Sequence, residues 1–190
     1  MGLFKRLKEK RQIKKSMQAF QDKTNAFKSL KSSEIADVSD DDLTPAVMSW
    51  IWGLIGDEWD YPCEIILDLP HPCQFVYSCR TIIDEVYNGG FNQLYFNPSA
   101  MFSKLAEEGF SDIGTEKLAD IMRQANDISE KVKPKLEEYD DGTAESFVKS
   151  YDECFFNKLD QLFYDELETC DFDNLLVLYI RKNAACFGKQ

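Results

Sequence analysis

Apolar residues recur at intervals of three and four positions along most of this chain, and Gly or Pro separates the successive runs. The clearest run contains Phe75, Cys79, Ile82 and Val86. Side chains with this spacing share one face of an α-helix. We therefore predict an all-α fold, in which a compact multi-helix domain follows a helical arm.

The boundaries of the helices are predicted from caps and breakers. Thr44 followed by Pro45 is typical of a helix start, and Asn88-Gly89-Gly90 of a C-terminal turn. Residues 56–73 contain three prolines and are predicted to be irregular, with an extended segment over 64–69. The run 175–180 is apolar all round and predicts a central helix capped by Asp173. The expected helices are 3–31, 45–55, 74–88, 91–96, 100–109, Thr115 to about Pro134, one starting at Thr143, and one starting near Asp173.

Charge divides the chain into a basic arm and an acidic body. Residues 1–31 hold ten Lys/Arg and two acids, a net charge of +8, whereas residues 32–190 hold twelve Lys/Arg and thirty-two acids, a net charge of −20; the sum is −12. An acidic body repels the phosphates of DNA and RNA, so direct nucleic-acid binding is disfavoured. The predicted organisation is an arm over 1–31, a linker over 32–43 and an acidic domain over 44–187.

The arm has several possible partners. Its apolar residues follow a helical spacing and its other face is mostly Lys and Arg, a pattern typical of helices that lie on anionic membranes. The same helix could pack on the acidic body or on a second copy in a homodimer. A solvated, fraying arm is an equally good interpretation.

Cysteine and histidine usage gives little support for a metal site or an enzyme. None of the six cysteines forms a CxxC pair, and the one histidine, His71, stands between two prolines, where a structural role is far commoner than a catalytic one. There is no Gly-rich phosphate loop and no calcium loop. We expect no catalytic residue, metal or cofactor. Since no secretory signal is visible, we expect a cytoplasmic protein with free thiols.

The stretch Glu85 to Asn97 contains Asn-Gly-Gly-Phe followed by Gln, aromatic residues and Asn. It resembles the signature of a bacterial DNA-mimic protein family, and the resemblance extends over about residues 69–187. It implies an all-helical fold, often dimeric, with no known catalytic activity. In that family, acidic members present carboxylates in place of DNA phosphates and so occupy a DNA-binding protein. The signature residues are Glu85, Asn88, Gly89, Gly90, Phe91, Gln93 and Asn97.

The signature has a physical interpretation of its own. Gly89 and Gly90 permit a turn that other residues resist. The polar side chains beside it are expected mainly to satisfy helix ends and neighbouring backbone. A small polar pocket is the alternative.

Clusters of acids are the candidates for phosphate mimicry. A carboxylate stripe along one helix face can imitate a phosphate ridge, and positions seven and eight apart lie about 10–12 Å apart along a helix. A solvent-exposed position is enough to explain the presence of any single acid. It explains the large net negative charge of the whole body less well. The candidate contact residues are Glu137, Glu138, Asp140, Asp141, Glu145, Asp152, Asp160, Asp165, Glu166 and Glu168.

The sequence thus predicts a non-enzymatic acidic protein that binds the DNA-binding face of a regulatory or nucleoid protein. The alternative is an immunity-type inhibitor that covers a toxin, or another interaction module unrelated to DNA.

Overall fold

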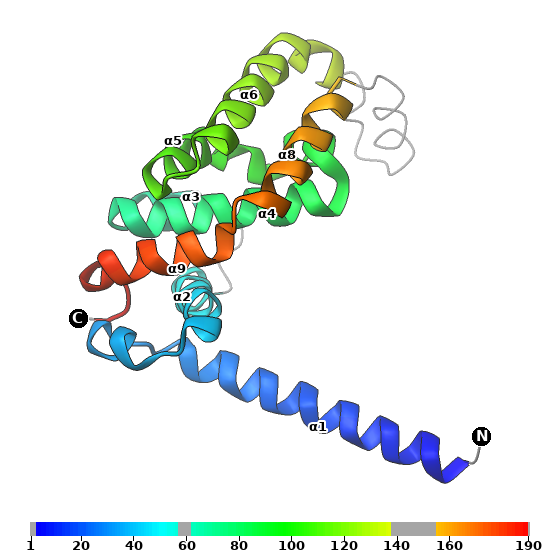
Figure 1. Ribbon diagram of the computed structural model, residues 1–190, viewed down its shortest axis with the longest axis vertical. Helices are drawn as coiled ribbons and strands as arrows, with labels where there is room; N and C mark the ends of the chain where they lie inside the picture. The colour runs from blue at the N-terminus through cyan, green and yellow to red at the C-terminus, as the bar shows by residue number, and fades with distance from the viewer. Residues whose placement is uncertain (1–2, 57–61, 138–154, 190) are drawn as a thin grey trace.

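The computed structural model describes residues 3–56, 62–137 and 155–189 (Figure 1). Within these ranges the secondary structure is helical apart from one isolated bridge between Lys31 and Lys189, so the predicted all-α fold is confirmed. The elements are α1 (Leu3–Phe27), η1 (Ser32–Asp37), α2 (Asp40–Ile55), α3 (Pro62–Leu67), α4 (His71–Phe96), η2 (Pro98–Phe102), α5 (Ser103–Ile113), α6 (Glu116–Glu137), α8 (Asn157–Thr169), α9 (Phe172–Lys182) and η4 (Ala184–Cys186).

Helix α4 is the central element of the body. It packs against α2, α3, α5, α8 and α9, and its residues 73–79 are all buried. Around its second half an aromatic cluster forms, in which the Phe163 ring meets Phe91 edge-on at 5.3 Å and Phe110 at 6.0 Å between centroids. Aromatic pairs in this geometry stabilise a core beyond the area they bury. The cluster fixes α8 against α4 and α5.

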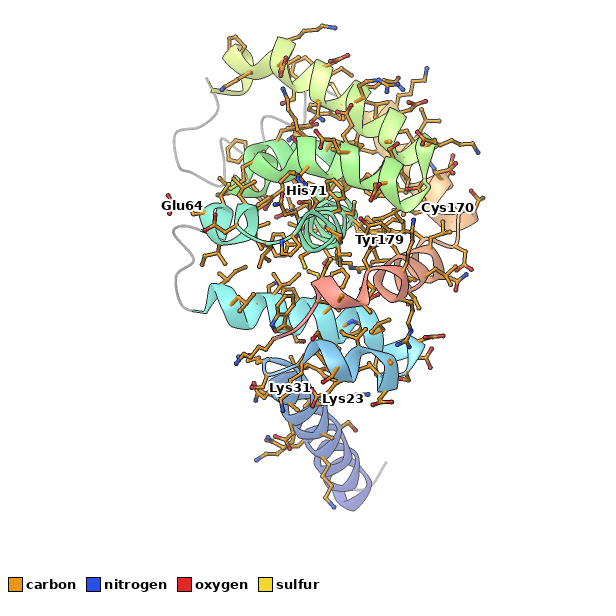
Figure 2. The ribbon with its side chains drawn as sticks, turned by 90° about the vertical axis from the view of Figure 1, so that its left-hand side faces the viewer. Lys23, Lys31, Glu64, His71, Cys170 and Tyr179 are labelled. Atoms are coloured by element: carbon orange, nitrogen blue, oxygen red, sulfur yellow. The ribbon has the colours of Figure 1, made fainter. Side chains whose placement is uncertain are left out.

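Helix α1 leaves the body as a single rod (Figure 1). Its C-terminal end is anchored: Phe27 packs on the core, and Lys23 Nζ lies 2.6 Å from Asp42 Oδ1. The described residues from Lys14 to Ala19 are all exposed. Figure 2 shows Lys23 and Lys31 together at the place where the rod meets the body. The arm is therefore a helix, and it does not fold back along the acidic body.

The segment 32–43, predicted to be a linker, is folded. It contains η1 and the first turn of α2, and Ile35 and Leu43 are completely buried. Arg181 on α9 holds it in place by donating to the carbonyl oxygens of Ile35 and Val38. The linker prediction was wrong because a polar local sequence gave no sign of a partner about 140 residues away.

The prediction that α2 starts at Thr44-Pro45 was also wrong. The helix starts at Asp40 after an N-cap at Ser39, whose hydroxyl donates to Asp42 Oδ2 at 2.7 Å. Three acids in the first turn favour that start through the helix dipole. Pro45 lies inside the helix, which gives up the one hydrogen bond that its missing N–H would have made.

Three other local predictions were wrong. Residues 64–67 are helical in α3 rather than extended. Helix α9 has its N-cap at Asp171, so Asp173 falls in the first turn. Leu178 is 56% exposed, so α9 buries one side rather than all of its apolar run.

Candidate protein-binding surface

The end of α8 and the start of α9 form an acidic corner, which we define as Asp165, Glu168, Asp171 and Asp173. All four residues are exposed. They face solvent because α8 turns Leu159 and Phe163 inward, while α9 does the same with Phe172 and Leu176. Residues 165–173 contain five acids and no Lys or Arg. Like charges this close repel one another, and a cationic partner would relieve that repulsion.

Two of the predicted contact acids are engaged within the fold. Glu166 has a side chain that is only 16% exposed and lies 3.2 Å from Lys117 Nζ on α6. Asp160 is half-buried and accepts a hydrogen bond from the Phe91 amide. Only Asp165 and Glu168 of the predicted α8 acids are therefore open to a partner. The predicted acids Glu138, Asp140, Asp141, Glu145 and Asp152 lie outside the described residues, and Glu137 is the last residue of α6.

A groove of about 680 Å³ lies beside the corner and was not predicted from the sequence. We call it the basal groove, since it opens where α1 joins α2, α4 and α9. Its walls include Met48, Trp52 and Val177, and its rim carries acids from three helices. The run Asp40-Asp41-Asp42 could have suggested it, but a helix N-terminus explained those acids equally well. The rim acids are Asp40, Asp41, Asp84 and Asp173.

Arg80 joins the basal groove to a second, smaller groove. Its guanidinium lies 2.7 Å from Asp84 and 3.5 Å from Asp173. The second groove, of about 320 Å³, runs past Glu168 and Asp171 to the same arginine. The acidic corner and the basal groove are thus neighbouring parts of one surface, which carries seven exposed acids and Arg80.

The Asn-Gly-Gly-Phe signature forms a kink inside α4. Gly90 has φ 70° and ψ −177°, a conformation open essentially to glycine alone. A Cβ at this position would also lie 2.8 Å from Asp160 Oδ2. The Asp160 carboxylate occupies this space and accepts from the Phe91 amide at 2.7 Å, so it caps the second half of the helix.

Burial raises the pKa of the Asp160 carboxyl above its ordinary value, and the hydrogen bond from Phe91 opposes part of the rise.

Glu85 holds the other side of the kink. Its Oε2 accepts from Gln93 Nε2 at 3.1 Å and from Asn97 Nδ2 at 2.9 Å, while its Oε1 accepts from Ser99 Oγ at 2.5 Å. Four signature-region side chains therefore satisfy one another, which supports the structural interpretation over a ligand pocket. Asn88 is exposed at the kink, and Phe91 is completely buried.

The described residues do not assemble a recognisable catalytic or metal centre. His71 is exposed at the start of α4, with its ring centroid 5.7 Å from that of Phe75. Across the described ranges, no three His, Cys, Asp or Glu side chains converge as metal ligands would. Burial raises the pKa of the Cys73 thiol to about 12 and that of Cys79 well above its usual range, so both are poor nucleophiles at neutral pH.

The comparisons with known proteins decide the family. Residues 67–183, more than half of the chain, match the family described as DMP19-like protein. The chain belongs to this family. DMP19 proteins are DNA mimics, as the sequence resemblance had implied, and they are not a known enzyme family. No curated protein and no solved structure matches the chain.

The DMP19-like region includes the whole of α4 and the acidic corner. It excludes α1, η1 and α2, so the basic arm and most of the basal groove are additions to the family region. In the described part of the chain, every helix is too short or too polar to cross a bilayer.

Proposed function

We propose that this protein is a non-enzymatic DNA mimic that occupies the DNA-binding face of a regulatory or nucleoid protein. Membership of the DMP19-like family supports this class of function, and the acidic corner supplies a surface with the required chemistry. The proposed partner has basic residues that ordinarily contact phosphates.

The exposed acids of the corner carry the proposal. Asp165 and Glu168 are one helical turn apart, and Asp171 and Asp173 continue the charge across the turn into α9. Apart from Arg80 beside Asp173, no Lys or Arg among the described residues forms an ion pair with these four acids. Lysine and arginine side chains of a DNA-binding protein would find carboxylates here in place of phosphates, which is the contact that fixes such proteins on a duplex.

Charge reversal at the corner tests the proposal. The full chain would first be used to capture proteins from lysate of its host while duplex DNA is titrated in. The affinity of the captured partner would then be measured for the wild type, for a corner variant and for a control variant. Asp165→Lys/Glu168→Lys should weaken binding at least about tenfold, because both attraction and encounter rate depend on these charges.

The matched control is Glu64→Lys/Asp68→Lys, which makes the same change in net charge. Glu64 and Cys170, the neighbour of the corner, lie at opposite edges of the molecule in Figure 2. Equal loss of affinity in both variants would show a general charge effect and contradict a site at the corner.

DNA competition separates the mimic from the toxin inhibitor. A mimic and DNA need the same face of the partner, so DNA should release the captured protein. A single toxin-like partner that DNA does not displace would overturn the mimicry proposal and favour the immunity-type function.

A further inference from the structure

We propose that the basal groove binds the basic arm of a second copy of this chain, so that two copies exchange their α1 helices in a symmetric dimer. This interface goes beyond the mimicry proposal and does not depend on it. It also lies mostly before residue 67, outside the DMP19-like region.

The first reason is the isolation of α1. The rod projects away from the body, and its described residues from Lys14 to Ala19 are all exposed (Figure 1). Its sequence also places like charges at helical neighbours, as in the pairs Lys10/Lys14 and Arg11/Lys15, which weaken an isolated helix. Helices in proteins depend chiefly on tertiary packing for their stability. The outer half of α1 therefore needs a surface to pack on.

The second reason is complementarity between the arm and the groove. Residues 3–15 hold seven Lys/Arg and one acid, a net charge of +6, together with apolar Leu3, Phe4, Leu7 and Ile13. The groove offers the opposite arrangement, with an apolar floor and an acidic rim. Trp52 is 43% exposed there, although large aromatic side chains are seldom left open. A basic helix that also carries apolar side chains has chemistry complementary to both the floor and the rim.

The third reason is reach. A chain cannot place the outer half of α1 in its own groove, because the groove opens at the base of the same straight helix, beside Thr24. A second copy running antiparallel can. If the two helices cross at Ser16 and Met17, Thr24 of one copy lies opposite residue 9 of the other. Residues 3–8 then lie over the groove.

A shallow depression along α1 marks the crossing point. It is lined by Ser16, Met17, Gln21 and Thr24, which form one stripe on the helix and lead into the basal groove. Met17 is 65% exposed in this stripe. The depression and the groove share Thr24, so one continuous surface can receive the partner helix over its full length.

The test measures the oligomeric state of the full chain by sedimentation velocity and light scattering. The wild-type chain should be dimeric at a concentration where Leu7→Asp, in the arm, and Trp52→Asp, in the groove, are each monomeric. Both variants should keep the wild-type circular dichroism. Met101→Asp is the control, since Met101 is 52% exposed but lies in η2, which packs on α4 and α5 and has no place in the interface.

Mixing the two variants makes the test specific. In an exchanged dimer, the intact arm of the Trp52→Asp chain fits the intact groove of the Leu7→Asp chain, so a 1:1 mixture should recover dimer with one of the two contacts. An interface elsewhere on the body would be unaffected by the single substitutions. A pairing of α1 helices alone would leave Trp52→Asp dimeric.

A wild-type chain that stays monomeric overturns the proposal. If such a monomer floats with vesicles containing phosphatidylserine and Leu7→Asp does not, the arm is a membrane-binding helix instead. Partner capture through the acidic corner is measured separately, with the corner variants, so failure of the dimer and failure of mimicry are distinguishable.

Discussion

The Asp160 carboxylate accepts a hydrogen bond from the backbone amide of Phe91, at 2.7 Å across 69 residues of sequence. This contact joins α8 to the kink of α4. It also explains why an acid that the helical spacing places among the candidate phosphate mimics is turned inward.

Removing this acceptor should destabilise the protein. Asp160→Ala leaves the Phe91 amide without its partner, which should lower the free energy of unfolding by about 1–3 kcal/mol. Urea unfolding measures the loss. Asp165→Ala, one and a half turns along the same helix but exposed, should change it by less than about 0.5 kcal/mol.

The same carboxyl should make stability depend on pH. Because its pKa is raised above 3.8 in the folded state, the folded chain binds the Asp160 proton more tightly than the unfolded chain does. Its contribution is fully present below pH 3.8 and is lost as the pH rises through the folded-state pKa. Asp160→Asn keeps an acceptor but does not titrate. The unfolding free energy of the wild type minus that of Asp160→Asn should therefore fall as the pH rises above 3.8. A constant difference would contradict the assignment.

The kink should tolerate substitution at one glycine and not at the other. Gly90→Ala introduces a side chain at φ 70° and within 2.8 Å of the Asp160 carboxylate, and we expect a loss of about 2 kcal/mol or more. Gly89 has φ −166°, which any residue adopts, so Gly89→Ala should cost less. Thermal unfolding compares the two. In the double variant Gly90→Ala/Asp160→Ala the clash is gone, but the backbone strain at position 90 remains. The double variant should therefore lose less stability than the sum of the losses of the two single variants.

Replacing the Glu85 carboxylate by an amide should destabilise the protein. Glu85→Gln replaces one of two acceptor oxygens with a donor, which then faces the donors of Gln93, Asn97 or Ser99. We expect a loss of about 1–3 kcal/mol in unfolding free energy. Glu108→Gln, on an exposed position of α5, is the matched control and should be near neutral. Equal effects of the two substitutions would show that the network does not stabilise the kink.

The hydrogen bonds that Arg181 donates to residues 35–40 should require the geometry of a guanidinium group. Arg181 Nη2 reaches both the Val38 carbonyl and Asp40 Oδ1 at 2.6 Å. Lysine keeps the charge but offers one ammonium group in place of a fork of donors. Arg181→Lys should therefore lower the unfolding free energy by about 1–2 kcal/mol, whereas Lys182→Ala, exposed on the next residue, should not. Faster proteolysis within 32–40 in Arg181→Lys alone would locate the loss to η1.

Local sequence was sufficient where the cause of a structure is local. The apolar spacing of 75, 79, 82 and 86 follows from the geometry of a helix, and the kink at Gly89-Gly90 from the φ and ψ values that glycine allows. The helix was confirmed, and the predicted break at the glycines is a kink inside α4 rather than the end of one helix and the start of another. The prediction for the start of α2 was wrong because the local sequence offers two helix starts, one after Ser39 and one at Pro45. In the structure Arg181 of α9 contacts Val38 and Asp40, next to the first of these.

The sequence by itself determined that the chain is helical, that its arm is basic and its body acidic, and that the regular helix is interrupted at Gly89 and Gly90. These properties depend on neighbours within a few positions or on simple counts of charge. Only the tertiary structure decided which acids face solvent. Asp160 and Asp165 are both acids of α8, yet one caps a helix 69 residues away and the other is exposed. The difference arises because burial and long-range hydrogen bonds are fixed by how helices pack, and packing joins residues that no local pattern connects.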